Sequence, residues 1–171
     1  MIPKTVVPQP GDFILTNIEG RGGRLIAVGQ FLNGTGFSKY EHVALCVGDG
    51  RVIEMAGYGI REDSLEKYRN TAHRYSTGLI DLTEKERKDI VVASRQYLAQ
   101  KIGYSWPDYG ALALRRFHIP APHLKAYVES TGHMICSQLV AACYRDGGHP
   151  LYDHWTGYVT PGDLNKLLDE A

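Results

Sequence analysis

The chain has 171 residues, which is enough for one domain with a sizeable hydrophobic core. Its 19 Lys and Arg residues balance its 19 Asp and Glu residues, so the composition excludes the strongly basic surface of a typical nucleic-acid-binding protein. Hydrophobic residues make up 43% of the chain, which excludes a disordered polypeptide, and its three cysteines, without regular spacing, argue against a disulfide scaffold.

No apolar stretch reaches the length of a membrane-spanning helix, and residues 1–8 lack the apolar segment of a secretion signal. We therefore expect no integral membrane segment, and a protein that is cytoplasmic or that leaves the cell by lysis or through a partner. The sequence contains no phosphate-binding loop, dinucleotide-binding fingerprint, repeat or linker. We expect a single domain over 1–171 that needs no cofactor and binds no nucleic acid.

The first third of the chain predicts short strands. Apolar and β-branched residues between turn residues predict strands over 12–17, 41–47 and 51–55, and a short helix over 24–32. Gly48-Asp49-Gly50 joins the last two strands, which predicts a hairpin.

The rest of the chain predicts mostly helices. Thr83 and Glu86 form a capping box that opens a helix ending near Gly103. Thr160-Pro161 begins the last helix. Because strands cluster early and helices late, we expect an α+β fold with a small antiparallel sheet or partial barrel packed against helices. The other expected elements are a sheet extension over 57–61, a helical turn over 63–68, a strand over 73–80, a segment over 108–117 and a short helix over 123–128.

Residues 134–148 contain the candidate nucleophile, Cys136. Apolar residues recur at helical spacing from Ile135 to Cys143, and Gly147-Gly148 ends the pattern. Cys136 thus lies in the first helical turn, where the helix dipole and backbone N–H groups favour a thiolate. Cys143 lies two turns further along the apolar face and is expected to be a buried small hydrophobe. A core position without reactivity is the alternative for Cys136.

A cysteine nucleophile requires a base, and His42 is the best candidate among seven histidines. It begins an apolar strand, where a buried imidazole needs a partner. His133, three residues before Cys136, is the rival, and a structural His42 bonded to backbone is the alternative. The others lie beside Pro, Gly or charged residues and are expected at the surface: His73, His118, His123, His149 and His154.

The hairpin decides whether Glu54 can orient His42. If 48–50 form a three-residue loop with Gly50 at positive φ, Ala44 pairs with Glu54. Glu54 then lies diagonally from His42, at about 7–8 Å, on the same face of the sheet. A two-residue turn over Asp49-Gly50 would place Glu54 on the opposite face, where a strand glutamate is ordinarily exposed to solvent.

A zinc site is the competing chemistry. His42 and Cys46 share one strand face, and Cys136 and Cys143 share one helix. Structural zinc sites usually contain closely spaced ligand pairs, whereas seven residues of helix span about 10 Å. The spacing therefore disfavours a single tetrahedral ion, and we expect no metal.

Five short blocks together resemble the circularly permuted NlpC-type papain-like cysteine hydrolases. They start at Gly11, Glu41, Val47, Ile135 and Thr160, and read Gly-Asp-Phe-Ile-Leu, Glu-His-Val-Ala-Leu, Val-Gly-Asp-Gly-Arg-Val-Ile-Glu, Ile-Cys-Ser-Gln-Leu-Val and Thr-Pro-Gly-Asp-Leu. In permuted members of that family the histidine strand precedes the cysteine helix, as it does here. The resemblance covers nearly the whole chain.

The resemblance implies a papain-like fold in which Cys136 is the nucleophile, His42 the base and Glu54 the third polar residue. Gly103-Tyr104-Ser105 is similar to another family motif, with Ser105 where an acid is more usual. Relatives include murein peptidases, amidases and lipid acyltransferases, so the fold does not determine the substrate. We expect cleavage of an amide bond in a small peptide-like substrate, such as a cell-wall peptide. Lipid acyl transfer, thioesterase activity and a non-catalytic binding module remain alternatives.

Overall fold

The computed structural model describes residues 6–17, 39–56, 59–104, 133–153 and 159–171, and its centre is an antiparallel sheet. In the described ranges, this sheet has five strands in the order β4-β3-β2-β1-β5. The α+β class predicted from the sequence is confirmed. The strands are β1 (Phe13–Thr16), β2 (His42–Gly48), β3 (Arg51–Ala56), β4 (Gly59–Ser64) and β5 (His73–Tyr75).

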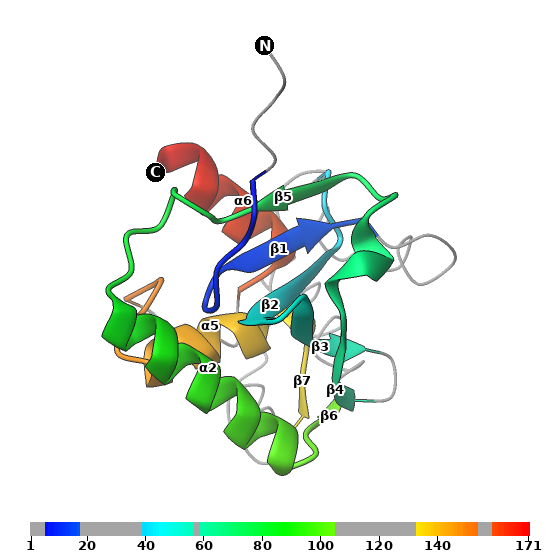
Figure 1. Ribbon diagram of the computed structural model, residues 1–171, viewed down its shortest axis with the longest axis vertical. Helices are drawn as coiled ribbons and strands as arrows, with labels where there is room; N and C mark the ends of the chain where they lie inside the picture. The colour runs from blue at the N-terminus through cyan, green and yellow to red at the C-terminus, as the bar shows by residue number, and fades with distance from the viewer. Residues whose placement is uncertain (1–5, 18–38, 57–58, 105–132, 154–158) are drawn as a thin grey trace, which may run out of the picture.

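Among the described residues, three α-helices pack against this sheet. Figure 1 shows α2 and α5 side by side below the sheet, and α6 beside β5 at the other end. A short 3-10 helix, η1, follows β4 directly. Two very short strands, β6 after α2 and β7 just before α5, pair in parallel. The bounds are η1 (Leu65–Tyr68), α2 (Glu84–Ala99), β6 (Gly103–Tyr104), β7 (His133–Met134), α5 (Cys136–Asp146) and α6 (Pro161–Glu170).

Alternation along the strands divides the core into two layers. On one face of the sheet, fully buried side chains such as Phe13, Leu45 and Ile53 pack against Leu139 of α5 and Leu164 of α6. The opposite face carries a smaller cluster that η1 covers, formed by Ile14, Ala44, Cys46, Val52 and Tyr68. Burial of this apolar surface, at about 25 cal/mol per Å², is the main force that holds the layers together.

The helix ends follow the capping chemistry predicted from the sequence. Thr83 accepts a hydrogen bond from the Glu86 N–H, and the Glu86 carboxylate accepts one from the Thr83 N–H. The helix α5 ends at Asp146, and Gly147 lies so close to Ile90 of α2 that a Cβ atom would come within 2.4 Å of its side chain. A glycine at this position lets α5 end against α2.

Two predicted boundaries were wrong. The helix α2 ends at Ala99 rather than near Gly103, because the chain turns at Lys101, which has a positive φ of 54°. The strand expected over 73–80 stops at Tyr75, because residues 76–79 form a turn closed by a hydrogen bond from the Leu79 N–H to the Ser76 carbonyl.

Several expected elements lie outside the described residues. They are the helix over 24–32, the segment over 108–117 and the short helix over 123–128. Within the described ranges, no helix is both long enough and apolar enough to cross a membrane.

Candidate active site

The β2–β3 hairpin places Glu54 on the same face as His42, although by a different turn from the predicted one. Asp49 and Gly50 both have positive φ, 51° and 67°, as in a two-residue type I′ turn, and Gly48 pairs with Arg51. The predicted three-residue loop is therefore wrong, whereas the positive φ of Gly50 is confirmed.

A β-bulge restores the register that the two-residue turn would have lost. The pairing shifts between Cys46 and Gly48, so that Val47 is the extra residue and Ala44 pairs with Glu54. A one-residue slip moves every side chain to the other face, and the bulge cancels that slip. Glu54 consequently lies diagonally from His42, as required for contact between them.

His42, Glu54 and Cys136 meet at the start of β2 and the start of α5. The His42 Nε2 atom lies 2.7 Å from Glu54 Oε2, and both residues are buried, with exposed fractions of 5% and 1%. The Cys136 side chain makes a hydrogen bond with His42 and interacts with its charge. The structure thus brings together the three residues that the sequence singled out, and Glu54 is not the solvent-facing residue of the alternative.

Cys136 occupies the first position of α5, as its place in the sequence predicted. The preceding Ile135 donates its backbone N–H to the Gln138 side chain at 2.7 Å, which fixes the entry of the chain into the helix. Ser137 donates to the Val159 carbonyl at 2.7 Å and ties this first turn to the segment before α6. The sulfur atom therefore lies at the positive end of the helix dipole, which favours negative charge.

Within the described part of the chain, Glu54 accepts hydrogen bonds from four side chains. Arg61 Nε lies 2.9 Å from Oε1, and Lys67 Nζ donates to the same oxygen. The Tyr68 hydroxyl donates to Oε2, the oxygen that also contacts His42. A buried carboxylate requires such compensation, because an isolated charge in the interior is strongly unfavourable.

These contacts set the protonation of the pair. Burial alone would lower the pKa of His42, but the hydrogen bonds and negative charges of Cys136 and Glu54 raise it to about 9. Burial alone would raise the pKa of Glu54, but hydrogen bonds and charge from His42, with further donation from Lys67 and Tyr68, hold it far below its usual range. Near neutral pH the site thus contains an imidazolium next to a carboxylate.

The other two cysteines have different surroundings, although all three are buried. Burial and the charge of Asp12 raise the pKa of the Cys46 thiol to about 12. Burial and the charge of Asp146 raise the pKa of Cys143 as well. Neither has a histidine among the causes of its shift, so both are expected to stay protonated and unreactive.

The remaining candidates are only partly described. His73 contacts the Thr71 carbonyl at 2.9 Å, and His149 contacts Glu86 at 3.0 Å, so neither belongs to the site. The side chains of His133 and Tyr104, and the residues His118, His123, His154 and Ser105, lie outside the described part of the chain. Among the described residues, no group of three or more His, Cys, Asp or Glu side chains could hold a metal ion.

The sequence interpretation missed the side chains that hold Glu54. Arg61 is directly opposite Glu54 in the β3–β4 register, and such cross-strand pairs of opposite charge are a recognisable signal once the two strands are paired. Lys67 and Tyr68 belong to the stretch that was predicted only as a helical turn. Their role depends on how η1 folds back over the sheet, which no local pattern reveals.

A surface hollow of about 1010 Å³ lies beside η1 and β5 and is lined in part by Leu65, Arg69, His73 and Tyr75. The hollow is separate from His42, Glu54 and Cys136, none of which lines it. Its size therefore does not bear on the chemistry of Cys136.

The comparisons with known proteins find a distant relative and no matching family model. No family model matches the chain. The chain is 25% identical, over 93% of its own length, to a protein of Escherichia coli (strain K12) named as the probable lipoprotein peptidase YaeF. The chain spans 63% of the length of that relative.

Proposed function

We propose that this protein is a cysteine hydrolase that cleaves an amide bond in a peptide-like substrate. The observation that carries the proposal is the contact of His42 with both Glu54 and Cys136, at the first turn of a helix. The likeness to a protein named as a probable peptidase supports an amide as the bond that is cleaved. Residues 1–171 would form one circularly permuted papain-like domain.

In the first half of the reaction, Cys136 acts as the nucleophile. Its Sγ attacks the carbonyl carbon of the amide, and the negative charge develops on the carbonyl oxygen near the first turn of α5, where the Cys136 N–H would stabilise it. Because His42 Nε2 contacts Glu54, the other ring nitrogen, Nδ1, is the one left for the cysteine. His42 then donates a proton to the leaving amine as the C–N bond breaks, which leaves a thioester on Cys136.

In the second half, water hydrolyses the thioester. His42, now neutral, accepts a proton from water, and the resulting hydroxide attacks the thioester carbonyl. The C–S bond breaks, the carboxylic acid product leaves, and the thiolate–imidazolium pair is restored. Throughout, Glu54 holds the imidazole in one orientation and stabilises its positive charge.

The assay that tests this function compares peptide substrates with acylated lipids. We expect the protein to cleave murein stem peptides, and Cys136→Ala to lose more than about 10³-fold in rate, as nucleophile removal does in other triads. Cys143→Ala, which removes another buried sulfur from the same helix, should keep the activity within a few-fold. Release of fatty acid with the peptides untouched would overturn the amide assignment. No turnover and no reactive thiol would instead indicate a binding module.

A further inference from the structure

The side chains around Glu54 form a cluster that nothing in the reaction above requires. Lys67 Nζ bonds both Glu54 and Asp63, the latter at 2.8 Å, and lies 4.8 Å from the centre of the Tyr68 ring. Arg61 bonds Glu54 at 2.9 Å and lies 3.4 Å from Asp63. We call Arg61, Asp63, Lys67 and Tyr68 the Glu54 clamp. Lys67 and Tyr68 are neighbours on η1.

The clamp contacts both members of the His42–Glu54 pair. Tyr68 donates to the Glu54 oxygen that contacts His42, and its ring lies 6.1 Å from the His42 ring, centre to centre. Tyr68 is itself 6% exposed, so it is fixed by packing. One rigid residue therefore contacts both the imidazole and its acid, which restricts where each can move.

The charges of Glu54 and its clamp cancel each other. Glu54 and Asp63 contribute two negative charges, and Arg61 and Lys67 contribute two positive ones. The His42–Cys136 pair is neutral overall whether the proton lies on nitrogen or sulfur. Without Lys67, the buried site would carry a net negative charge next to the sulfur, and a like charge disfavours a thiolate.

Of the two cations, Lys67 has the larger effect on the charge felt inside the site. Its side chain is 27% exposed, whereas that of Arg61 is 53% exposed, so water screens Arg61 more. Among the described residues, the charged and titratable groups that face Glu54 are His42 of β2, Arg61 and Asp63 of β4, Lys67 and Tyr68 of η1, and, through His42, Cys136 of α5.

We propose that Lys67 and Tyr68 are positioning residues that hold Glu54 ionised and fixed against His42, and that Lys67 cancels the charge that Glu54 would otherwise exert on the Cys136 sulfur. This inference rests on the proposed function, because it assigns a purpose to the clamp only if Cys136 reacts as a thiolate. The short helix η1 is, in this view, part of the active site, although neither residue touches substrate.

The test measures two titrations in the full chain. The first is the pH dependence of Cys136 alkylation by iodoacetamide, followed by mass spectrometry. The second is the NMR titration of the His42 imidazole, assigned with His42→Gln. Removal of one positive charge should favour the imidazolium and disfavour the thiolate, so Lys67→Met should move both titrations to higher pH by about half to one unit.

Two variants serve as controls for Lys67→Met. Lys67→Arg keeps the charge and should titrate like the unmodified protein, within about 0.2 units for both groups. Lys85→Met removes another lysine that pairs with an aspartate, Asp89, but on α2, and it should shift neither titration. If Lys67→Met leaves both titrations unchanged, or if Lys85→Met shifts them equally, the proposal is overturned.

Tyr68→Phe tests the positioning role separately, since it removes one oxygen and no charge. We expect kcat for the peptide substrate to fall several-fold with KM unchanged, because Tyr68 acts through Glu54 and His42. An unchanged kcat would contradict its role. The His42 titration does not depend on turnover, so a protein without hydrolase activity would refute the proposed function while the effect of Lys67 on His42 could still be measured.

Discussion

Two buried thiols of this protein, Cys46 and Cys136, each interact with a buried carboxylate. They differ because an imidazole lies between the thiol and the carboxylate only at Cys136. Asp12 acts on Cys46 directly, and its charge adds to burial in raising the pKa of that thiol to about 12. Glu54 acts on Cys136 through His42, whose pKa the two anionic partners raise to about 9. The same ingredients, a thiol and an acid, thus give an inert cysteine in one place and a candidate nucleophile in the other.

The partners of the two carboxylates explain the difference. Asp12 is held by Arg87 at 2.7 Å, by Thr77 at 2.7 Å and by the Gln9 N–H at 2.8 Å, and these contacts join β1 to α2. Glu54 is held by the clamp and by an imidazole. A carboxylate that meets only structural donors stabilises the fold, whereas one that meets a histidine can pass its influence to a third group.

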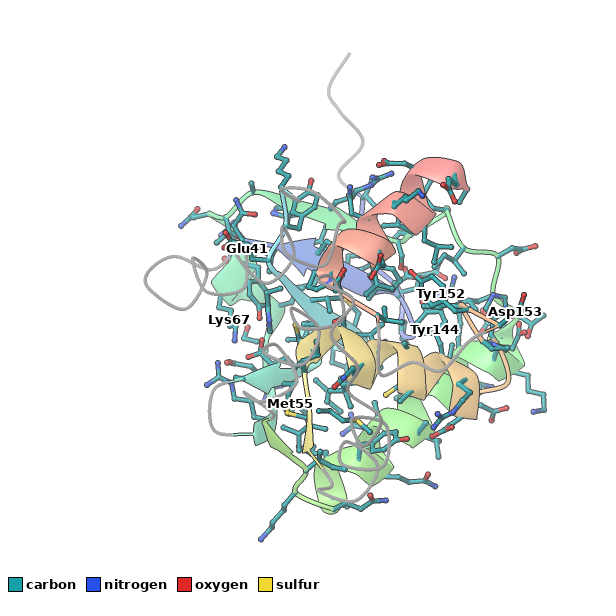
Figure 2. The ribbon with its side chains drawn as sticks, turned by 180° about the vertical axis from the view of Figure 1, so that it is seen from behind. Glu41, Met55, Lys67, Tyr144, Tyr152 and Asp153 are labelled. Atoms are coloured by element: carbon teal, nitrogen blue, oxygen red, sulfur yellow. The ribbon has the colours of Figure 1, made fainter. Side chains whose placement is uncertain are left out.

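Figure 2 shows where the Glu54 clamp and the two ends of α5 lie in the molecule. Lys67 lies on the side where Glu41 precedes β2, while Tyr144 and Tyr152 lie on the other side, toward the far end of α5. Tyr144 donates to the Gly11 carbonyl at 2.7 Å and so anchors α5 to the start of β1. One end of α5 is therefore tied to the structural carboxylate region, and the other presents Cys136 to His42.

The largest expected effect comes from removing the imidazole between acid and thiol. His42→Gln should slow the alkylation of Cys136 at pH 6 by about 10²- to 10³-fold, because a thiol of ordinary pKa is almost fully protonated at that pH. Cys46 should not change. Rates are read by mass spectrometry of each labelled peptide, and an unchanged Cys136 rate would make His42 a structural residue.

The second prediction concerns stability and pH. The pKa of His42 in the folded protein, about 9, lies above its ordinary value of 6.5, so folding favours the imidazolium. This contribution, at most about 3 kcal/mol, is present in full below pH 6.5 and is lost as pH rises through 9. Urea unfolding of the unmodified protein and His42→Gln should show a stability difference that shrinks by this amount between pH 6 and pH 9.5. A constant difference would contradict the raised pKa.

A smaller effect is expected when the acid keeps its shape but loses its charge. Glu54→Gln should lower the pKa of His42 by about one unit, because it removes a negative charge in contact with the imidazole. The NMR titration of His42 measures this shift directly. Should His42 titrate as before, Glu54 would not be the group that orients it.

The smallest effect should come from the structural carboxylate. Asp12→Asn removes the charge beside Cys46 and should lower the pKa of that thiol by less than about one unit, because burial is the larger cause of its shift. Cys46 should still react far more slowly than Cys136. If Cys46 becomes as reactive as Cys136, charge alone, without an imidazole, would account for the contrast.

Much of this fold could be predicted from local signals. The starts of α2 and α6 were predicted correctly from the capping residues Thr83 and Thr160, and the end of α5 from the glycines that follow it. The first three strands were predicted from their β-branched and apolar residues. Each of these signals acts on its immediate neighbours in the chain. The hairpin turn was mispredicted, since a bulge at Val47 and a two-residue turn give the same register as a three-residue loop. A pattern of residues does not distinguish the two.

The site could be predicted only in part, for a related reason. Cys136 and His42 stand out by their places in a helix and a strand, and a resemblance to known hydrolases connected them. The clamp depends instead on η1 folding back over the sheet, so Lys67 and Tyr68 approach Glu54 from 13 and 14 residues away. Such contacts are set by tertiary packing, and the periodic pattern of apolar residues in the sequence does not predict them.

The most direct test of the account is the order in which the three cysteines react. The native protein is treated with a limiting amount of iodoacetamide at pH 6, and the labelled peptides are quantified by mass spectrometry. Because all three thiols are buried, burial alone does not favour one over the others, and the environment of each sulfur sets its thiolate fraction. We predict that Cys136 is labelled first, with Cys46 and Cys143 unlabelled until the protein unfolds. Preferential labelling of Cys46 or Cys143 would contradict it.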